Sequence, residues 1–390
     1  MKELKRLTIL RGILNDPVVR ALADAEPADD GRNLTESEAI FLHEVYSRGI
    51  EDTFVEYMSG VILDDENEYA RQCAAGKVPS RRMTVEFADN LAKAMNAACD
   101  ASETYRVDYG TLPDMFKGNP LEVADNLADY YRTNGYGRYS RYMAFRYEDG
   151  DLIPVENPVR VRLKDLKDYE YEKSLILNNI TGFLQGYPSL NMLLYGSKGT
   201  GKSSTIHAVL NEYFDQKLRL VQIDDGSLGK INEIRAKIEA IPMKWLVFVD
   251  DISMSGDDKR ISQLKASLEG NIAGDFKNSI IVATSNRRHI VKETFSDRND
   301  AVHGKDTMEE QLSLSDRFGI SILFSLTDKN TYLSIVRQLA EDSNIQTGTD
   351  ELEAMAERWA LVKGGRSPRR AKQFIEFLSS CEARKIEPEF

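Results

Sequence analysis

The residues with the clearest chemical potential are eight consecutive ones, 196–203, with the sequence GSKGTGKS. They fit the pattern G-x-x-x-x-G-K-[ST], which is typical of a loop whose backbone N–H groups cradle phosphates. Lys202 can reach the β- and γ-phosphates of a nucleotide, and the Ser203 hydroxyl can ligate Mg²⁺. Three glycines give the backbone freedom for the bend, namely Gly196, Gly199 and Gly201.

The flanking sequence supplies the elements that such a loop needs. Apolar residues Met192 to Tyr195 predict a buried strand before the loop, and a helix is expected from about Lys202 to Phe214. The start of that helix adds the positive end of its dipole at the same place. The predicted nucleotide contacts are Gly196, Ser197, Lys198, Gly199, Thr200, Gly201, Lys202, Ser203 and Ser204.

Two further polar groups follow apolar segments later in the chain. Asp250 and Asp251 come directly after WLVFV, and Asn286 follows SIIVAT and a serine. In open α/β sheets, ligands bind at the carboxyl ends of the strands. We therefore expect Asp250 to hold Mg²⁺, Asp251 to orient or deprotonate water, and Asn286 to position water or the γ-phosphate. The alternative for the paired acids is a helix cap or turn.

Strands and helices alternate from residue 166 to residue 326, which indicates a parallel sheet covered by helices on both faces. The expected fold class is α/β, with five parallel strands. Besides the strand before the loop, these are residues 218–223, 245–249, 279–284 and 320–326. A helix is expected before the first strand, at residues 166–184, and further helices between the later strands, at 228–240 and 259–272.

The pattern divides the chain into four parts. Residues 1–150 predict a mainly helical interaction domain, in which Thr35 and Glu38 form a capping box and 84–99 and 120–133 are amphipathic. Residues 151–165 contain two prolines and predict a linker. Residues 166–326 form the α/β core. Residues 327–390 predict a helical lid, with helices at 328–342, 350–362 and 367–385.

Composition narrows the function classes. The chain has 390 residues and a formal net charge of -12, so bulk attraction to nucleic acid or anionic membrane is not expected. Its three cysteines form no C-x-x-C pair, which argues against a zinc site and favours a reducing compartment. No apolar run is long enough for a membrane span, and we expect a cytoplasmic protein.

Residues 130–147, YYRTNGYGRYSRYMAFRY, combine tyrosines with arginines. Such a mixture can stack bases and hold phosphates. It suits the packing of a segment between two domains equally well. The packing role is the preferred interpretation, and nucleic-acid binding remains the alternative.

Several motifs carry a resemblance to a known class. The loop, WLVFVDD, ATSN, SDRFG and SPRRAKQF resemble AAA+ P-loop ATPases. More closely, residues 135–380 resemble a bacterial family known as domain of unknown function 815, in motifs such as LKASLEGNI, ATSNRRH, LSLSDRFG and GGRSPRRAKQF. The resemblance implies an ATP- and Mg²⁺-dependent hydrolase with a helical lid.

Within the AAA+ pattern, Asn286 matches the residue called sensor 1. Arg317 resembles the arginine finger that completes a neighbouring subunit's site, with Arg287 and Arg288 as rivals. Arg369 resembles sensor 2 in the lid, and Arg370 is its alternative. Tyr169 and Tyr171 lie where the class packs adenine. The finger implies a homo-oligomer, of which a hexamer is one candidate.

One departure concerns Asp251, because most of the class has glutamate there and aspartate is one methylene shorter. Residues 288–313 form a long polar insertion that predicts a mobile loop. His289 and His303 have no metal-ligand spacing.

The expected function is ATP hydrolysis in an oligomer that remodels an unidentified protein partner. Two alternatives remain: a slowly hydrolysing, ATP-dependent signalling switch, and a nucleic-acid loader or remodeller.

Overall fold

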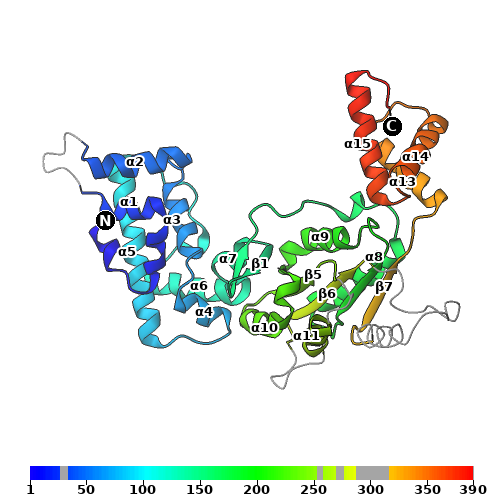
Figure 1. The fold of residues 1–390 in the computed structure, drawn as a ribbon. Helices are drawn as coiled ribbons and strands as arrows, with labels where there is room; N and C mark the ends of the chain where they lie inside the picture. Colours follow the sequence, from blue (N-terminus) through cyan, green and yellow to red (C-terminus); the bar gives the residue numbers. More distant parts are fainter. Residues whose placement is uncertain (27–33, 253–257, 269–275, 287–315, 390) are drawn as a thin grey trace. The chain divides into compact units, whose positions relative to one another are not determined.

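The computed structural model describes residues 1–26, 34–252, 258–268, 276–286 and 316–389. The chain divides into two compact units. Unit 1 comprises Met1–Tyr142 and Ala240–Met243, and unit 2 comprises Met143–Glu239 and Lys244–Phe390. Figure 1 shows helices in unit 1, and a sheet with surrounding helices in unit 2. None of the described helices combines the length and apolarity that a membrane crossing needs.

Unit 1 is helical over its described residues, as the amphipathic patterns predicted. Its 3-10 turns are η1 (Lys2–Arg6), η2 (Ile9–Asn15) and η3 (Asp114–Phe116). Its α-helices are α1 (Pro17–Asp24), α2 (Glu36–Arg48), α3 (Phe54–Leu63), α4 (Glu68–Ala74), α5 (Arg81–Tyr105), α6 (Pro120–Asn134) and α7 (Gly137–Arg141).

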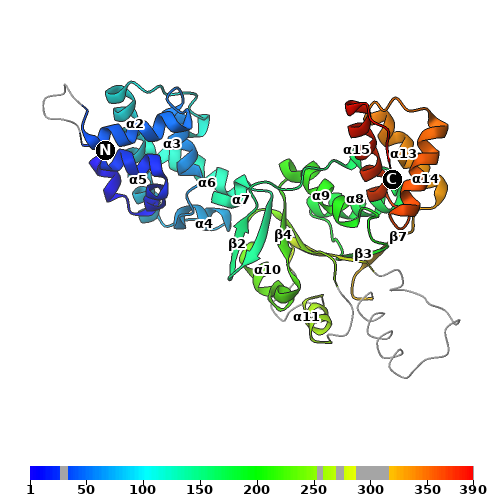
Figure 2. The ribbon, with the colours of Figure 1, turned by 45° about the horizontal axis from the view of Figure 1, so that its top comes forward.

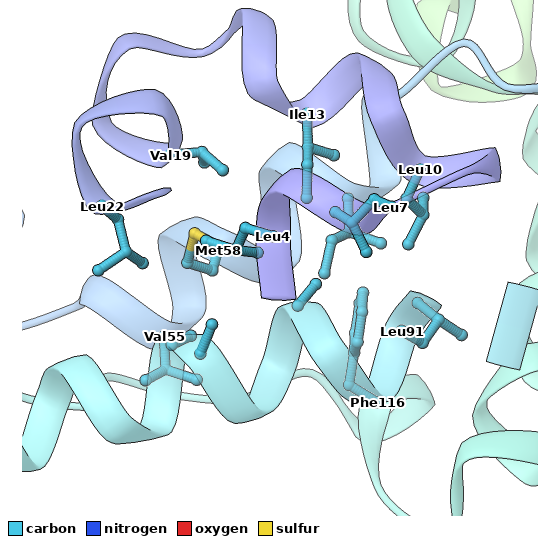
Figure 3. Packing of buried hydrophobic residues seen from close by; sticks show 14 of the residues in the cluster. Leu4, Leu7, Leu10, Ile13, Val19, Leu22, Val55, Met58, Leu91 and Phe116 are labelled. Atoms are coloured by element: carbon cyan, nitrogen blue, oxygen red, sulfur yellow. The ribbon is translucent and has the colours of Figure 1, made fainter. Parts of the chain in front are cut away.

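The predicted capping box starts helix α2. The Thr35 hydroxyl accepts the Glu38 N–H at 3.2 Å, and the Glu38 carboxylate accepts the Thr35 N–H at 2.7 Å. The helices of unit 1 share a hydrophobic core, in which Leu4, Val55 and Met58 are fully buried (Figure 3). Apolar residues from the first turns of the chain therefore pack on helices α3 and α5 within this unit.

The Tyr- and Arg-rich segment 130–147 takes part in packing. Tyr131 is fully buried, and Arg138 of helix α7 forms an ion pair with Glu66 at 2.6 Å. Each of the four arginines pairs with a carboxylate, in the pairs Arg132–Asp129, Arg138–Glu66, Arg141–Asp64 and Arg146–Glu148. Each of these pairs lies within a single unit, so the predicted packing between two domains and its alternative, nucleic-acid binding, both stay predictions.

Unit 2 is built on a seven-stranded sheet with the order β2-β1-β4-β5-β6-β3-β7. The strands are β1 (Ala144–Glu148), β2 (Asp151–Pro154), β3 (Met192–Gly196), β4 (Leu218–Ile223), β5 (Lys244–Val249), β6 (Ser279–Ser285) and β7 (Ile320–Phe324). Strands β4, β5, β6, β3 and β7 are the five that the sequence predicted, and each pairs in parallel with its neighbours. The predicted α/β fold class is confirmed.

The predicted strand count of five is wrong, because β1 and β2 extend the sheet. Strand β1 pairs in parallel with β4 and antiparallel with β2. They come from residues whose sequence predicted the end of a helical domain and a linker. Asp149 and Gly150 join them with positive φ angles of 49° and 84°. An Asp-Gly pair between short apolar segments is a hairpin signal. Of the two prolines that suggested a linker, Pro154 ends the edge strand β2 and Pro158 follows it.

Four α-helices accompany the sheet in the described residues, namely α8 (Glu170–Leu184), α9 (Lys202–Tyr213), α10 (Ile231–Glu239) and α11 (Asp258–Leu268). The same part of the chain has the 3-10 turns η4 (Leu163–Asp165), η5 (Phe214–Gln216) and η6 (Asp225–Lys230). The first helix of the lid, α13 (Lys329–Asp342), follows β7. Helix α8 starts four residues later than predicted. Asp168 and Tyr169 have left-handed φ angles of 67° and 61°, which a helix cannot contain.

The chain ends in the predicted helical lid, which consists of α13, α14 (Thr349–Val362) and α15 (Pro368–Arg384) (Figure 2). Tyr332, Trp359 and Phe374 are buried among these helices in a core of their own. The Ser367 hydroxyl caps α15 and Pro368 occupies its first turn, so the sequence SPRR specifies where this helix begins.

Candidate functional site

The phosphate-loop motif forms a tight turn between strand β3 and helix α9. At Gly196 the φ angle is 132°, and a Cβ atom there would lie 2.1 Å from the carbonyl oxygen of Phe324 on strand β7. Gly199 and Gly201 also have positive φ angles, of 84° and 97°. The three glycines are thus required by backbone geometry, and at Gly196 also by the close approach of a neighbouring strand.

The loop opens into a cavity of about 550 Å³, within the range of small-ligand sites. The motif lines it with Lys198, Gly199, Thr200, Gly201, Lys202 and Ser203, and the next residue, Ser204, lines it as well. Asp250, Asp251, Thr284 and Asn286 line it from the ends of β5 and β6. The lid contributes Ile335, Leu339, Asp342, Pro368, Arg369 and Lys372.

Lys202 is 5% exposed at the base of this cavity. Its ammonium donates to the carbonyl oxygens of Ser197 at 2.8 Å and Gly196 at 3.1 Å, and to the amide oxygen of Asn286 at 3.1 Å. Burial lowers the pKa of Lys202 to about 8, although Asp251 and Asp250 act in the opposite direction. The carbonyl groups of Gly196 and Ser197 therefore fix the position of the Lys202 ammonium, although neither residue lines the cavity.

Ser203 and Asp250 meet beside that cation. The Ser203 hydroxyl donates to Asp250 Oδ1 at 2.6 Å, and the Thr284 hydroxyl donates to the same oxygen at 2.6 Å. Mg²⁺ favours such hard oxygen ligands together with the oxygens of phosphates. The hydroxyl of Ser203 and the carboxylate of Asp250 thus fit the ion that the motif implies.

Asp251 follows in a left-handed conformation with a φ angle of 55°. Its N–H donates to the Thr284 hydroxyl oxygen at 2.8 Å, and its carboxylate accepts a hydrogen bond from the amide nitrogen of Asn286. The two residues that the sequence predicted to act on water are therefore in direct contact. They follow the ends of neighbouring strands, because β5 and β6 pair in parallel.

The lid meets the phosphate loop at the start of helix α15. The backbone N–H of Arg369 donates to the carbonyl of Gly199 at 3.2 Å, and its side chain lines the cavity. The guanidinium of Arg370 donates instead to Gln373 on the same helix, and Arg370 is not among the residues that line the cavity. Of the two candidates for a lid cation, the geometry favours Arg369.

The two tyrosines predicted to pack adenine differ in position. Tyr169 is 9% exposed, lines the cavity, and donates through its hydroxyl to the Ser325 carbonyl at 2.8 Å. Tyr171 is 71% exposed and does not line the cavity. The left-handed backbone at Tyr169 turns the chain between them, so only Tyr169 lies near the candidate site.

Arg317 lies in the turn before strand β7 and is half-buried. It does not line the cavity of its own chain. Its rivals Arg287 and Arg288 lie outside the described residues, as do the insertion 288–313 and the histidines His289 and His303.

Thr284 is a site residue that the sequence motifs did not reveal. A threonine in an apolar strand is an ordinary β-sheet residue, and its two contacts depend on the register of β6 against β5. Lys167 was missed as well. It lines the cavity and forms an ion pair with Asp342 of the lid at 2.8 Å.

Solved structures with partial likeness to this chain include the following two. The RuvB Holliday junction branch migration motor of Thermotoga maritima is 16% identical, with 58% of this chain and 66% of the motor covered and a TM-score of 0.40. The FIGL-1 AAA domain in complex with ADP is 17% identical, with 59% of this chain and 76% of the domain covered and a TM-score of 0.41. This chain thus spans slightly less than two thirds of the motor's length.

No curated protein matches this chain. A family model does match, over residues 140–382, and its description is protein of unknown function (DUF815). The matched region contains the phosphate loop, both aspartates, Asn286 and the start of the lid helix α15. The chain therefore belongs to the DUF815 family.

Proposed function

We propose that this protein binds ATP with Mg²⁺ and hydrolyses it to ADP and phosphate. The observation that carries the proposal is one cavity in which the loop residues Lys202 and Ser203 face the acids Asp250 and Asp251. A cation, a hydroxyl and paired carboxylates at the ends of parallel strands are the groups that phosphoryl transfer to water requires.

In this proposal, Lys202 and the N–H groups of the loop hold the β- and γ-phosphates. Ser203 and Asp250 hold Mg²⁺, which neutralises charge on the phosphates when it is bound. Arg369 contributes a second cation from the lid, where it lines the same cavity. Tyr169 lines the same cavity, packs against Phe324 and would lie near the adenine base.

Hydrolysis proceeds by direct attack of water on the γ-phosphorus. The bond to the oxygen bridging the β- and γ-phosphorus atoms breaks, ADP departs, and the proton of water passes to the Asp251 carboxylate. Asn286 holds that carboxylate through its amide nitrogen. The chain forms no covalent intermediate.

Asp251 also supports a slower variant of this function. An aspartate carboxylate reaches less far than a glutamate would, and its oxygen is already engaged by Asn286. A switch that binds ATP quickly and hydrolyses it slowly is therefore the second candidate function. Single-turnover kinetics separate the two, because a switch shows fast binding followed by a slow chemical step.

We further propose that the active form is a homo-oligomer that remodels a macromolecular partner. Arg317 does not line the cavity of its own chain, so a role in hydrolysis requires a neighbour's site. A guanidinium supplied across a subunit boundary can stabilise charge on the γ-phosphate in the transition state. The helical unit 1 is the proposed partner-binding domain.

Nucleotide binding and phosphate release test the core of the proposal. The wild-type chain is expected to bind ATP and release phosphate, whereas Lys202→Ala loses ATP binding while its far-UV circular dichroism is unchanged. Lys277→Ala is the matched control, because Lys277 is an exposed lysine at the opposite end of the sheet. ATP affinity of Lys202→Ala equal to that of the wild type would refute the assignment of the loop.

A further inference from the structure

Thr284 stands between the two candidate catalytic acids. It is 2% exposed, near the end of strand β6, and the parallel register places β6 beside the end of β5. Its hydroxyl contacts Asp250 and Asp251, and its carbonyl oxygen accepts the N–H of Ile252 at 2.8 Å. Thr284 thus forms hydrogen bonds with three consecutive residues after β5, namely Asp250, Asp251 and Ile252.

The Thr284 hydroxyl donates one of its two hydrogen bonds and accepts the other. A threonine hydroxyl has one proton to donate and lone pairs that accept. The Asp251 N–H is a donor, so it occupies a lone pair, at 2.8 Å. The single proton is therefore directed at Asp250 Oδ1, at 2.6 Å. Because this oxygen also accepts from Ser203, two hydroxyl donors hold the Asp250 carboxylate in one orientation.

The bond to Asp251 acts on the backbone. A left-handed φ angle of 55° is unfavourable for a residue with a side chain, although aspartate tolerates it better than most. The bonds from Asp251 N–H and Ile252 N–H to Thr284 offset part of that cost. This turn directs the Asp251 carboxylate toward Asn286, which donates to it.

We propose that Thr284 is a positioning residue that sets the orientation of both carboxylates, of Asp250 through its hydroxyl proton and of Asp251 through its hydroxyl oxygen. The inference rests on the proposed ATP hydrolysis and deepens it. In this role Thr284 touches no substrate atom. Loss of the hydroxyl releases the Asp250 carboxylate from one of its two donors and leaves the Asp251 N–H without its acceptor.

The test compares Thr284→Val with Thr284→Ser in the full chain. Valine keeps the branched shape but has no hydroxyl, whereas serine keeps the hydroxyl and loses one methyl group. For Thr284→Val we expect kcat to fall about 10- to 100-fold, as is usual when a partner that orients a metal ligand is removed. The Mg²⁺ concentration for half-maximal activity should rise. Thr284→Ser should recover most of the lost activity.

Two measurements separate positioning from a general loss of structure. ATP affinity in EDTA, which depends on the loop and not on the metal, should be the same in Thr284→Val and the wild type. Ser285→Ala is the matched control, because Ser285 is a buried neighbour on β6 whose hydroxyl donates to the Ile252 carbonyl at 3.3 Å and not to an acid. Its kcat and Mg²⁺ dependence should equal those of the wild type.

Three results would overturn the inference: wild-type kcat and Mg²⁺ dependence in Thr284→Val, failure of Thr284→Ser to recover activity, or an equal loss in Ser285→Ala. If Thr284→Val does not fold, Thr284→Ala also removes the hydroxyl and does not add the methyl group that valine places where the hydroxyl was. If the wild type binds ATP but releases no phosphate, the hydrolysis proposal fails by itself. The Mg²⁺-dependent gain in ATP affinity, compared between wild type and Thr284→Val, then decides the role of Thr284.

Discussion

Lys202 donates a hydrogen bond to the amide oxygen of Asn286 at 3.1 Å, and the amide nitrogen of Asn286 donates to Asp251. The two residues lie 84 positions apart and meet because strands β3 and β6 are neighbours. The amide thereby connects the cation of the phosphate loop with the acid that is proposed to act on water. The ammonium of Lys202 is also buried, and this burial lowers its pKa.

ATP affinity is expected to depend on the protonation of Lys202. Burial lowers its pKa to about 8, so in the free protein the ammonium loses its proton as the pH rises through that value. ATP binding should be constant below pH 8 and weaken above it, with a limiting slope of about tenfold per pH unit when binding requires one proton.

The measurement is a titration of ATP affinity in EDTA between pH 7 and pH 10. Lys202→Arg keeps its charge over the whole range and therefore provides the baseline for any titration of the nucleotide itself. A wild-type profile parallel to that of Lys202→Arg would contradict the assignment.

The same pKa shift predicts a change in stability with pH. In the unfolded chain Lys202 keeps its proton up to about its ordinary pKa of 10.5, whereas in the folded chain it loses it near 8. Between these values the unfolded state binds more protons, so this group's contribution to the free energy of unfolding rises with pH. The difference in Tm between wild type and Lys202→Met should therefore change over pH 8 to 10.5, and no change there would contradict the shift.

Substitutions of Asp250 and Asp251 are expected to impair ATP turnover in different ways. Asp250→Ala removes a proposed Mg²⁺ ligand and should abolish the Mg²⁺-dependent part of turnover. Asp251→Asn should bind ATP with near wild-type affinity and hydrolyse it at least about 10²-fold more slowly, within the range for loss of a general base. Phosphate release under single-turnover conditions measures both. Wild-type turnover of Asp251→Asn would assign the activation of water to another group.

Arg317 is expected to act on a neighbouring subunit. An arginine finger contributes roughly 10³- to 10⁵-fold to the rate, so Arg317→Ala should bind ATP nearly normally and hydrolyse it far more slowly. Mixing Arg317→Ala with Lys202→Ala is the sharper test. The first lacks the finger but binds ATP, and the second keeps the finger but lacks the loop cation.

Mixed oligomers should regain part of the activity at interfaces that combine an intact loop with an intact finger. Absence of any recovery, once co-assembly has been demonstrated by pull-down of differently tagged chains, would exclude a finger acting between subunits. Full activity of Arg317→Ala alone would remove Arg317 from the site.

Gly196→Ala is expected to disturb the loop more than a substitution at an unobstructed glycine. The new Cβ would have to displace the Phe324 carbonyl, and the φ angle of 132° is one that alanine rarely adopts. Gly186→Ala is the matched control, because Gly186 has a φ angle of 85° and no atom within 4 Å of the added Cβ. Strained backbone alone costs about 1–3 kcal/mol. A lower Tm for Gly196→Ala than for Gly186→Ala checks the prediction, and equal Tm values would contradict it.

Local sequence signals were sufficient for most of the architecture. The alternation of apolar strands with helical patterns predicted the five parallel strands and the three lid helices. The capping box at Thr35 predicted where helix α2 begins, because this cap involves only residues close in the chain. The phosphate loop was evident because its function requires particular residue types at fixed spacing.

Other features required the tertiary structure. The hairpin of β1 and β2 was concealed by nearby prolines, and its place in the sheet depends on pairing with β4, more than 70 residues away. Tyr169 and Tyr171 have similar sequence contexts, and only the left-handed backbone before α8 separates a cavity residue from an exposed one.

The sequence by itself determined which groups are available for chemistry, since a phosphate loop and two strand-end acids are patterns of residues close in the chain. It did not determine which oxygen each group contacts. Thr284 contacts Asp250 and Asp251 only because β6 lies beside β5 in a particular register, and a shift by one residue would turn its side chain to the other face of the sheet. Long-range strand pairing therefore decided the geometry of the candidate site.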